Sequence, residues 1–200
     1  MSPGNPMSAG SSPLQKIARR AWADLLVSEH MKPLNEDEIR ASFINCSKGE
    51  ARRLNLPRGM GELPWDDLDF LGWRDHGAPD RAYLVAERPE GLVGITLRVP
   101  TGVRRSNLKS NICSICVTAH PGSGVSLLAA RKAGAAGREG STVGTYMCAD
   151  LACSLYVRGK KRPELVDRIT ESLTLEEQIT RTLVNLDTFL DQVIKETDGR

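Results

Sequence analysis

The sequence lacks any apolar run near the roughly 18 residues that a membrane-spanning helix requires. It also lacks a secretory signal, which needs a basic start, an apolar run and a small-residue cleavage site. Charged residues, among them Arg19, Arg20 and Asp24, interrupt the one apolar stretch of residues 1–30. We therefore expect a cytoplasmic protein with no membrane partner.

The motifs of common enzyme classes are missing as well. The chain contains no GxSxG nucleophile motif, no Walker phosphate-binding loop and no HExxH zinc-protease motif. Its three histidines, His30, His76 and His120, stand in no paired arrangement with a nucleophile. These absences predict that the protein is not an enzyme and has no small-molecule substrate.

Charge is nearly balanced, at a net +2, but it is distributed unevenly along the chain. Residues 98–162 hold eleven Lys and Arg against two acidic residues. Residues 36–80 hold ten acidic against six basic residues, and residues 163–200 hold nine acidic against four basic residues. A basic block between acidic flanks suits an acidic or polyanionic partner. It is equally compatible with a solvated surface whose patches neutralise one another.

The N-terminal part differs in composition from the rest. Residues 1–13 are rich in Pro, Gly, Ser and Asn and cannot bury enough apolar surface to order themselves. With a marginal helix over residues 14–30, they predict a flexible N-terminal extension over residues 1–30. Asn35 and Glu38 form a capping-box pattern that predicts a helix over residues 36–48. That helix and a Pro- and Gly-containing connecting loop make up residues 31–64.

Short strands dominate the middle of the chain, and two helices close it. Strand candidates bounded by turn residues lie at 69–73, 82–86, 92–99, 125–130 and 142–147. One helix is expected from Cys148 or Ala149 to Arg158, with Gly159 as its C-terminal cap. Thr174 opens a second helix, whose apolar positions recur at a spacing near 3.6 and predict packing on the sheet rather than against a separate partner. The pattern predicts an α+β fold with an antiparallel sheet, a short N-terminal helical part and a long C-terminal helix.

Four of the five cysteines fall in two pairs. Cys113 and Cys116 are separated by two residues, and Cys148 and Cys153 by four, with 31 residues between the pairs. Disulfides are disfavoured without export, whereas zinc takes four thiolates tetrahedrally. A CxxC turn followed by a hairpin and a strand-to-helix junction is the order of a treble clef. We predict that these four cysteines bind one structural Zn²⁺, with no coordination position left for a catalytic water.

Alternatives to this ligand set are weaker. Four reduced core cysteines would give the same spacing, and a redox CxxC would open a helix, whereas Cys116 is followed by a loop. His120 is the nearest rival ligand, but Cys153 already completes the set. Cys46 is expected to be a small buried apolar residue.

Three segments carry a family resemblance. They are residues 31–50, from MKPL to SKGE, residues 64–75, PWDDLDFLGWRD, and residues 148–160, CADLACSLYVRGK. In these segments the chain resembles actinobacterial proteins with an elongation-factor-G-binding C-terminal treble-clef zinc finger, which are relatives of the fusidic-acid-resistance proteins. The resemblance spans about residues 31–195 and assigns residues 65–198 to the zinc-finger domain. The resistance proteins have a longer N-terminal helical bundle, for which this chain has little room.

The resemblance implies binding to elongation factor G and help for its release from the ribosome. Candidate contacts in the basic block are Tyr146, Tyr156, Arg158, Lys160 and Lys161, with the last three expected to point to solvent beyond the helix end. Compensation of the helix dipole would also explain why these three basic residues lie at the C-terminal end of the helix. The alternative partner is the ribosome through its RNA, bound by the same basic block, residues 98–162. We expect a monomer.

The N-terminal extension generates a first prediction. A protein that starts at Met31 should keep its zinc, its partner binding and a melting temperature within a few degrees of the full chain, because a lone helix of this length is marginal without packing. Thermal unfolding of both proteins checks it. A large drop in melting temperature would show that the helix around Trp22 belongs to the core.

Overall fold

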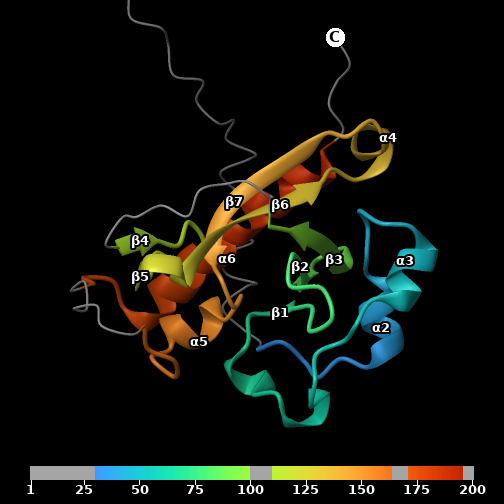
Figure 1. Cartoon of the computed structure of the whole chain (residues 1–200). Helices are drawn as coiled ribbons and strands as arrows, with labels where there is room; N and C mark the ends of the chain where they lie inside the picture. The colour runs from blue at the N-terminus through green and yellow to red at the C-terminus, as the bar shows by residue number, and fades with distance from the viewer. Residues whose placement is uncertain (1–29, 100–109, 164–170, 196–200) are drawn as a thin grey trace, which may run out of the picture.

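A five-stranded antiparallel sheet forms the centre of the computed structural model, which describes residues 30–99, 110–163 and 171–195 (Figure 1). The strand order is β1-β2-β3-β6-β7. The bounds are β1 (Phe70–Arg74), β2 (Arg81–Arg88), β3 (Gly91–Arg98), β6 (Val125–Arg131) and β7 (Thr142–Cys148). Two further strands, β4 (Ser110–Ile112) and β5 (Ala119–Pro121), pair as a separate ribbon. Each strand that the sequence predicts is confirmed, with ends that differ by at most two residues.

Helices lie on both sides of this sheet. They are α2 (Glu36–Ala41), α3 (Lys48–Arg53), α4 (Gly134–Arg138), α5 (Cys153–Val157) and α6 (Leu175–Ile194), with short 3-10 turns at Met60–Glu62, Trp65–Asp67 and Gly122–Gly124. The long helix α6 starts with the predicted capping box at Thr174. No helix in the described ranges is long and apolar enough to cross a membrane. Of the predicted extension over residues 1–30, residues 1–29 lie outside the described residues.

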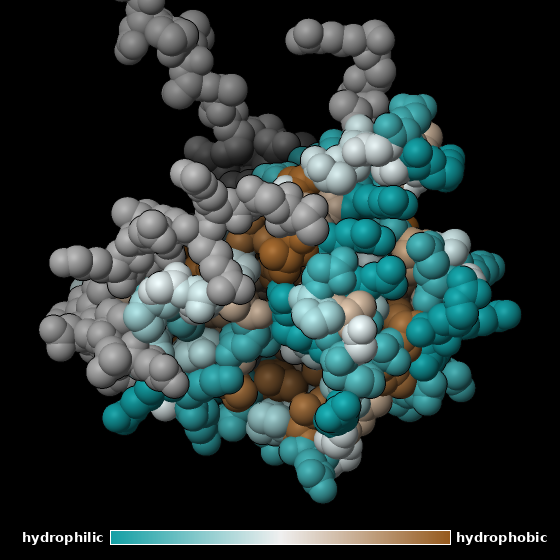
Figure 2. Space-filling view, viewed as in Figure 1, coloured by the Kyte–Doolittle hydropathy of each residue, from teal (hydrophilic) through white to brown (hydrophobic). Residues whose placement is uncertain are grey.

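The sheet separates two hydrophobic cores. On one face, α6 packs Leu186 and Leu190 into a cluster that includes Leu84 of β2, which confirms the packing predicted for α6. On the other face, Ile39 of α2 belongs to a cluster with Tyr83, the residue of β2 that comes directly before Leu84. Alternate residues of one strand thus serve opposite cores, as the pleat requires. Hydrophilic residues cover most of the outer surface over α2 and α3 (Figure 2).

The predicted single helix over residues 36–48 is wrong, because the chain leaves the helix at Ser42 to pair with the sheet. Phe43 forms a parallel bridge with Gly94 of β3. Ile44 N donates to Gly94 O at 3.0 Å, and Gly94 N donates to Ser42 O at 2.9 Å. A Cβ on Gly94 would lie 2.4 Å from Ser42 Oγ, so only glycine permits this approach. The helix resumes as α3 behind a new capping box formed by Ser47 and Glu50.

Asn45 closes the gap where β3 and β6 diverge. These strands pair at only two positions, Leu97 with Ala130 and Arg98 with Ala129. Asn45 Nδ2 donates to Thr96 O and to Arg131 O, both at 3.0 Å, and Thr96 N donates to Asn45 Oδ1 at 2.7 Å. One buried side chain therefore satisfies backbone groups that the strands cannot satisfy for each other.

Replacement of Asn45 tests this account. Asn45→Ala should lower the free energy of unfolding by about 1–3 kcal/mol, because buried backbone groups lose their partners. Asn45→Asp should be at least as destabilising, since it keeps the acceptor but faces two carbonyl oxygens without a donor. The control is Gln192→Ala on the exposed face of α6, for which urea unfolding should show little change. Equal stability of Asn45→Ala and the control would contradict the role of Asn45.

Candidate metal centre

The first cysteine pair lies in the turn of a short hairpin. Cys113 and Cys116 stand between β4 and β5, and Val117 N donates to Cys113 O at 2.9 Å to close the turn. Cys113 N donates in return to Thr118 O at 3.0 Å. Val117 adopts a positive φ of 61°, which reverses the chain after the second cysteine. The predicted knuckle is therefore present, with both sulfurs on its inner side.

The second pair spans the junction between β7 and α5. Cys148 ends the strand and Cys153 begins the helix, so the predicted helix start at Cys148 or Ala149 is wrong by several residues. Between them, Leu151 takes a φ of 59°, and its N–H donates to Cys148 O at 2.9 Å. A helix starting at Cys148 would exclude this left-handed residue, whose turn returns the chain toward the knuckle. A Cβ on Gly72 of β1 would lie 2.6 Å from Leu151 Cβ, so glycine lets the junction rest directly on the sheet.

The four sulfurs converge on one point. Cys113 Sγ lies 3.8 Å from Cys153 Sγ, and Cys116 Sγ lies 3.5 Å from Cys148 Sγ. All four sulfurs lie within 4.8 Å of one another, and all four side chains are buried. Zinc–sulfur bonds of about 2.3 Å in a tetrahedron require sulfur–sulfur edges of about 3.8 Å. The predicted cysteines therefore fit one zinc ion, and no other group of potential ligands of this kind is found among the described residues.

Without a metal ion, the four thiols cannot all ionise together. Hydrogen bonds with Cys113, Cys116 and Cys148, together with burial, raise the pKa of the Cys153 thiol well above its usual value. Four buried thiolates repel one another unless a cation lies between them. Zinc displaces the remaining protons, so its binding energy becomes folding energy. Four protein ligands close the coordination sphere, which makes the ion structural.

His120 supports the centre without joining the ligand group. This buried residue on β5 places Nε2 3.2 Å from Cys148 Sγ. Its ring meets the Tyr156 ring edge to face, with centroids 4.6 Å apart. Burial lowers the pKa of His120 and favours a neutral ring. A neutral ring with its proton on Nε2 donates a hydrogen bond to the Cys148 thiolate and stabilises its charge.

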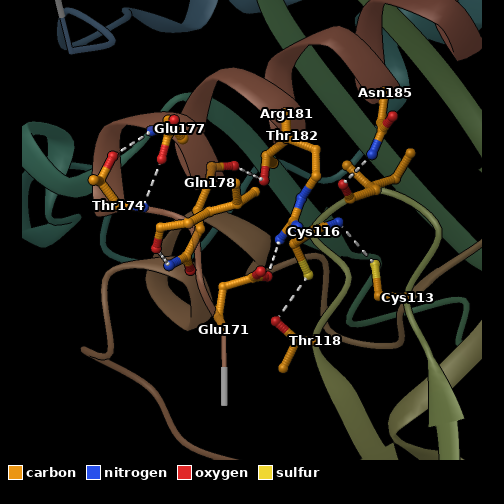
Figure 3. Close-up of polar contacts among 12 residues, drawn as sticks. Cys113, Cys116, Thr118, Glu171, Thr174, Glu177, Gln178, Arg181, Thr182 and Asn185 are labelled. Carbon is orange, nitrogen blue, oxygen red and sulfur yellow. Dashed lines mark hydrogen bonds and ion pairs between the residues drawn. The ribbon is translucent and has the colours of Figure 1, made fainter. Parts of the chain in front are cut away.

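The C-terminal helix holds the knuckle in place (Figure 3). Asn185 of α6 donates from Nδ2 to Ile115 O, inside the CxxC turn, at 2.9 Å. Thr118 Oγ1 lies 3.2 Å from Cys116 Sγ on the other side of the turn. Arg181, one turn before Asn185 on α6, pairs with Glu171 at 2.7 Å. α6 thus contacts both the sheet core and the metal-binding turn.

The expectation that Arg158 points to solvent is wrong. Arg158 Nη1 and Nη2 donate to the two carboxylate oxygens of Asp69, at 2.6 and 2.7 Å. The two side chains are only 7% and 6% exposed, so this pair is buried. Removing one partner of a buried pair leaves an uncompensated charge, at a cost of about 3–5 kcal/mol. Arg158 therefore fastens the end of α5 to the start of β1.

The other predicted contact residues remain on the surface. Tyr146 is 53% exposed on β7, and Lys160 and Lys161 have side chains that are 61% and 46% exposed. Lys161 Nζ lies 2.7 Å from Asp150 Oδ2, and the half-buried Tyr156 donates to the same oxygen at 2.9 Å. Burial opposes ionisation of Asp150, but hydrogen bonds led by that from Lys161 outweigh it and lower the pKa.

Sequence reasoning missed Asp69 and Asp150. Asp150 carried a local signal, because an aspartate between a strand and a helix commonly accepts a bond from the N–H two residues on. Its Oδ1 accepts from Ala152 N at 3.1 Å in this way. Asp69 carried no such signal, since its partner Arg158 lies 89 residues away. Cys46 is half-buried and packs against the core on the α2 side of the sheet, so the prediction that it is a buried apolar residue is confirmed in part.

A closed centre of four thiolates, formed by a hairpin knuckle and a strand-to-helix junction, defines a treble-clef zinc protein. A family model described as "FBP C-terminal treble-clef zinc-finger" matches residues 38–193, which include all four cysteines. The chain therefore belongs to the family of proteins with this zinc-finger domain.

The solved structure of the fusidic acid resistance protein FusC is similar at 16% identity and a TM-score of 0.48, covering 90% of this chain and 67% of that one. None of the proteins with curated descriptions matches this chain.

The metal centre generates a second kind of test. The purified protein should contain about one zinc ion per chain, and Cys148→Ser should lose the metal and unfold. Cys46→Ser is the matched control, because Cys46 lies outside the four-sulfur group and its loss should leave zinc content unchanged. Elemental analysis and circular dichroism check both variants. Carefully purified protein without zinc would contradict the assignment.

Proposed function

We propose that this chain is a non-enzymatic zinc protein that binds translation elongation factor G and promotes its release from the ribosome. The observation that carries the proposal is the family match over residues 38–193, together with the four-cysteine centre that this domain contains. The family's domain name and its relation to factor-binding proteins supply the partner.

A structural role for zinc supports a binding function. Four thiolates occupy the whole coordination sphere, so the ion has no position for a water or a substrate. The ion instead fixes the relative positions of the hairpin, β7 and α5. The residues after α5 are then presented on a rigid support.

The surface at the end of α5 supplies basic contacts. Lys160 Nζ lies 3.4 Å from Asp67, and Lys161 Nζ lies 2.7 Å from Asp150. Exposed ion pairs of this kind contribute little to stability, typically about 0–1 kcal/mol. Both lysines can therefore exchange their partners for acidic groups on a bound protein. Tyr146, exposed on β7, adds a large side chain with a polar end to the zinc-binding half of the molecule.

Ribosomal RNA is the second candidate partner. The excess of eleven basic over two acidic residues in the block 98–162 favours it. RNA binding releases about one counterion per neutralised phosphate, so its affinity should fall steeply with salt. The affinity for elongation factor G should fall less steeply with salt, and this binding should need no RNA.

A double substitution tests the surface. Lys160→Ala with Lys161→Ala should weaken binding to elongation factor G by about tenfold, or 1.4 kcal/mol, because two charges at the contact are lost. Arg158 is left in place because its loss would break a buried pair. Zinc content and melting temperature should stay unchanged, and calorimetric titration with purified factor measures the affinity.

The matched control replaces two exposed arginines near α3, Arg52→Ala with Arg58→Ala. It removes the same charge from a different surface and should keep full affinity. The proposed contact surface would be overturned if both double variants bound elongation factor G and ribosomes as tightly as the unmodified chain does. Ribosome binding that depends on RNA, together with no binding to free elongation factor G, would favour the RNA alternative.

A further inference from the structure

A pocket is lined by residues of α3, of the start of β2 and of the end of β3. Its volume is about 410 Å³, which is within the range of small-molecule sites. Its polar lining includes three arginines, two acidic residues and a tyrosine: Arg53, Arg81, Arg98, Glu50, Asp75 and Tyr83. The zinc centre and the lysines after α5 contribute nothing to this lining.

Two of these arginines stand directly opposite each other. Arg81 of β2 pairs in register with Arg98 of β3, two positions from the Tyr83–Thr96 pair that also lines the pocket. Residues two apart on a strand share a face, so both arginines belong to the pocket side of the sheet. Like charges directly opposite on neighbouring strands are destabilising. The register thus brings two like charges to directly opposite positions of the sheet, at a cost in stability.

The acidic residues in the lining are already committed to other partners. Asp75 accepts from Tyr83 Oη at 2.6 Å, from Asn55 Nδ2 at 2.8 Å, and from the backbone N–H groups of Gly77 and Ala78. Burial opposes its ionisation, but these bonds outweigh burial and lower the pKa of Asp75. Glu50 is held by Ser47 in the capping box of α3. Neither carboxylate forms an ion pair with Arg81 or Arg98.

No carboxylate elsewhere in the described parts of the chain forms an ion pair with Arg81 or Arg98. Residues 99–110, which follow Arg98, contain no Asp or Glu. The positive charge of Arg81 opposes the increase in the pKa of Tyr83 that burial and Asp75 cause.

We infer that this pocket binds a phosphate group, free or as the phosphomonoester of a small organic molecule, with Arg81 and Arg98 as its ligands. A phosphate offers several acceptor oxygens, so each guanidinium fork can donate two hydrogen bonds to it. The anion also removes the repulsion between the two cations. The pocket is larger than a phosphate ion, which leaves room for an organic group beside Thr96 and Leu54.

Calorimetric titration of the zinc-loaded full chain tests the inference, with inorganic phosphate and adenosine 5′-monophosphate as probes and chloride held at matched ionic strength. The unmodified chain should bind, and Arg81→Ser with Arg98→Ser should weaken binding at least about tenfold, because both forks are lost. Tighter binding of the nucleotide than of phosphate would identify a phosphomonoester site, and equal binding would identify a free-phosphate site. The matched control, Arg52→Ala with Arg58→Ala, should bind like the unmodified chain.

A second measurement covers the case in which the double variant does not fold. Phosphate added to the isotope-labelled, unmodified chain should shift the side-chain Nε–H resonances of Arg81 and Arg98, while those of Arg52 and Arg58 stay in place. No binding of either probe, or equal binding by the pocket variant and the control variant, would overturn the inference. So would uniform shifts over all surface arginines.

Discussion

Four buried thiolates that must share one cation are the constraint on which the zinc-binding half of the molecule depends. Cys113 and Cys116 come from a hairpin with only three residues in each strand, which has little core of its own. Cys148 and Cys153 come from a junction that needs a left-handed residue, Leu151. Zinc joins the two pieces, and its binding energy offsets the repulsion between the sulfurs and the entropy of ordering two loops. His120 and Asn185 then fix the sulfurs and the knuckle through hydrogen bonds.

The zinc centre and the sheet form one continuous structure because several long-range contacts join them. The four cysteines belong to the same hydrophobic cluster as the inner face of the sheet and α6. The buried pair of Asp69 and Arg158 links β1 to the end of α5, and Gly72 lets Leu151 rest on β1. On the other face, residues 31–54 share a core with β1 and β2. A disturbance at the metal therefore reaches the sheet directly.

The charged groups divide into three kinds, which differ in their exposure to water and in their partners. Arg158 and Asp69 are withdrawn from solvent and act as a structural link. Lys160 and Lys161 stay in solvent with exchangeable partners, which suits recognition of another macromolecule. Arg81 and Arg98 are a third case, since register places them together and neighbouring carboxylates are committed elsewhere. The two proposed surfaces lie on different elements, so each can be changed without changing the other.

The sequence by itself determined what depends on neighbours along the chain. The spacing of Cys113, Cys116, Cys148 and Cys153 predicted the metal ligands. The capping boxes predicted where α2 and α6 begin, and short segments bounded by turn residues predicted all five strands of the sheet. Only the tertiary structure decided what depends on distant partners. The helix breaks at Ser42 because the edge of β3 needs hydrogen bonds that no local pattern records. α5 begins at Cys153 because the chain must first turn back toward the knuckle, and Arg158 is buried because Asp69 lies 89 residues away in sequence but 2.6 Å away in space. Periodicity and capping report local backbone preference, whereas burial and ion pairing are set by whichever residues the fold brings together.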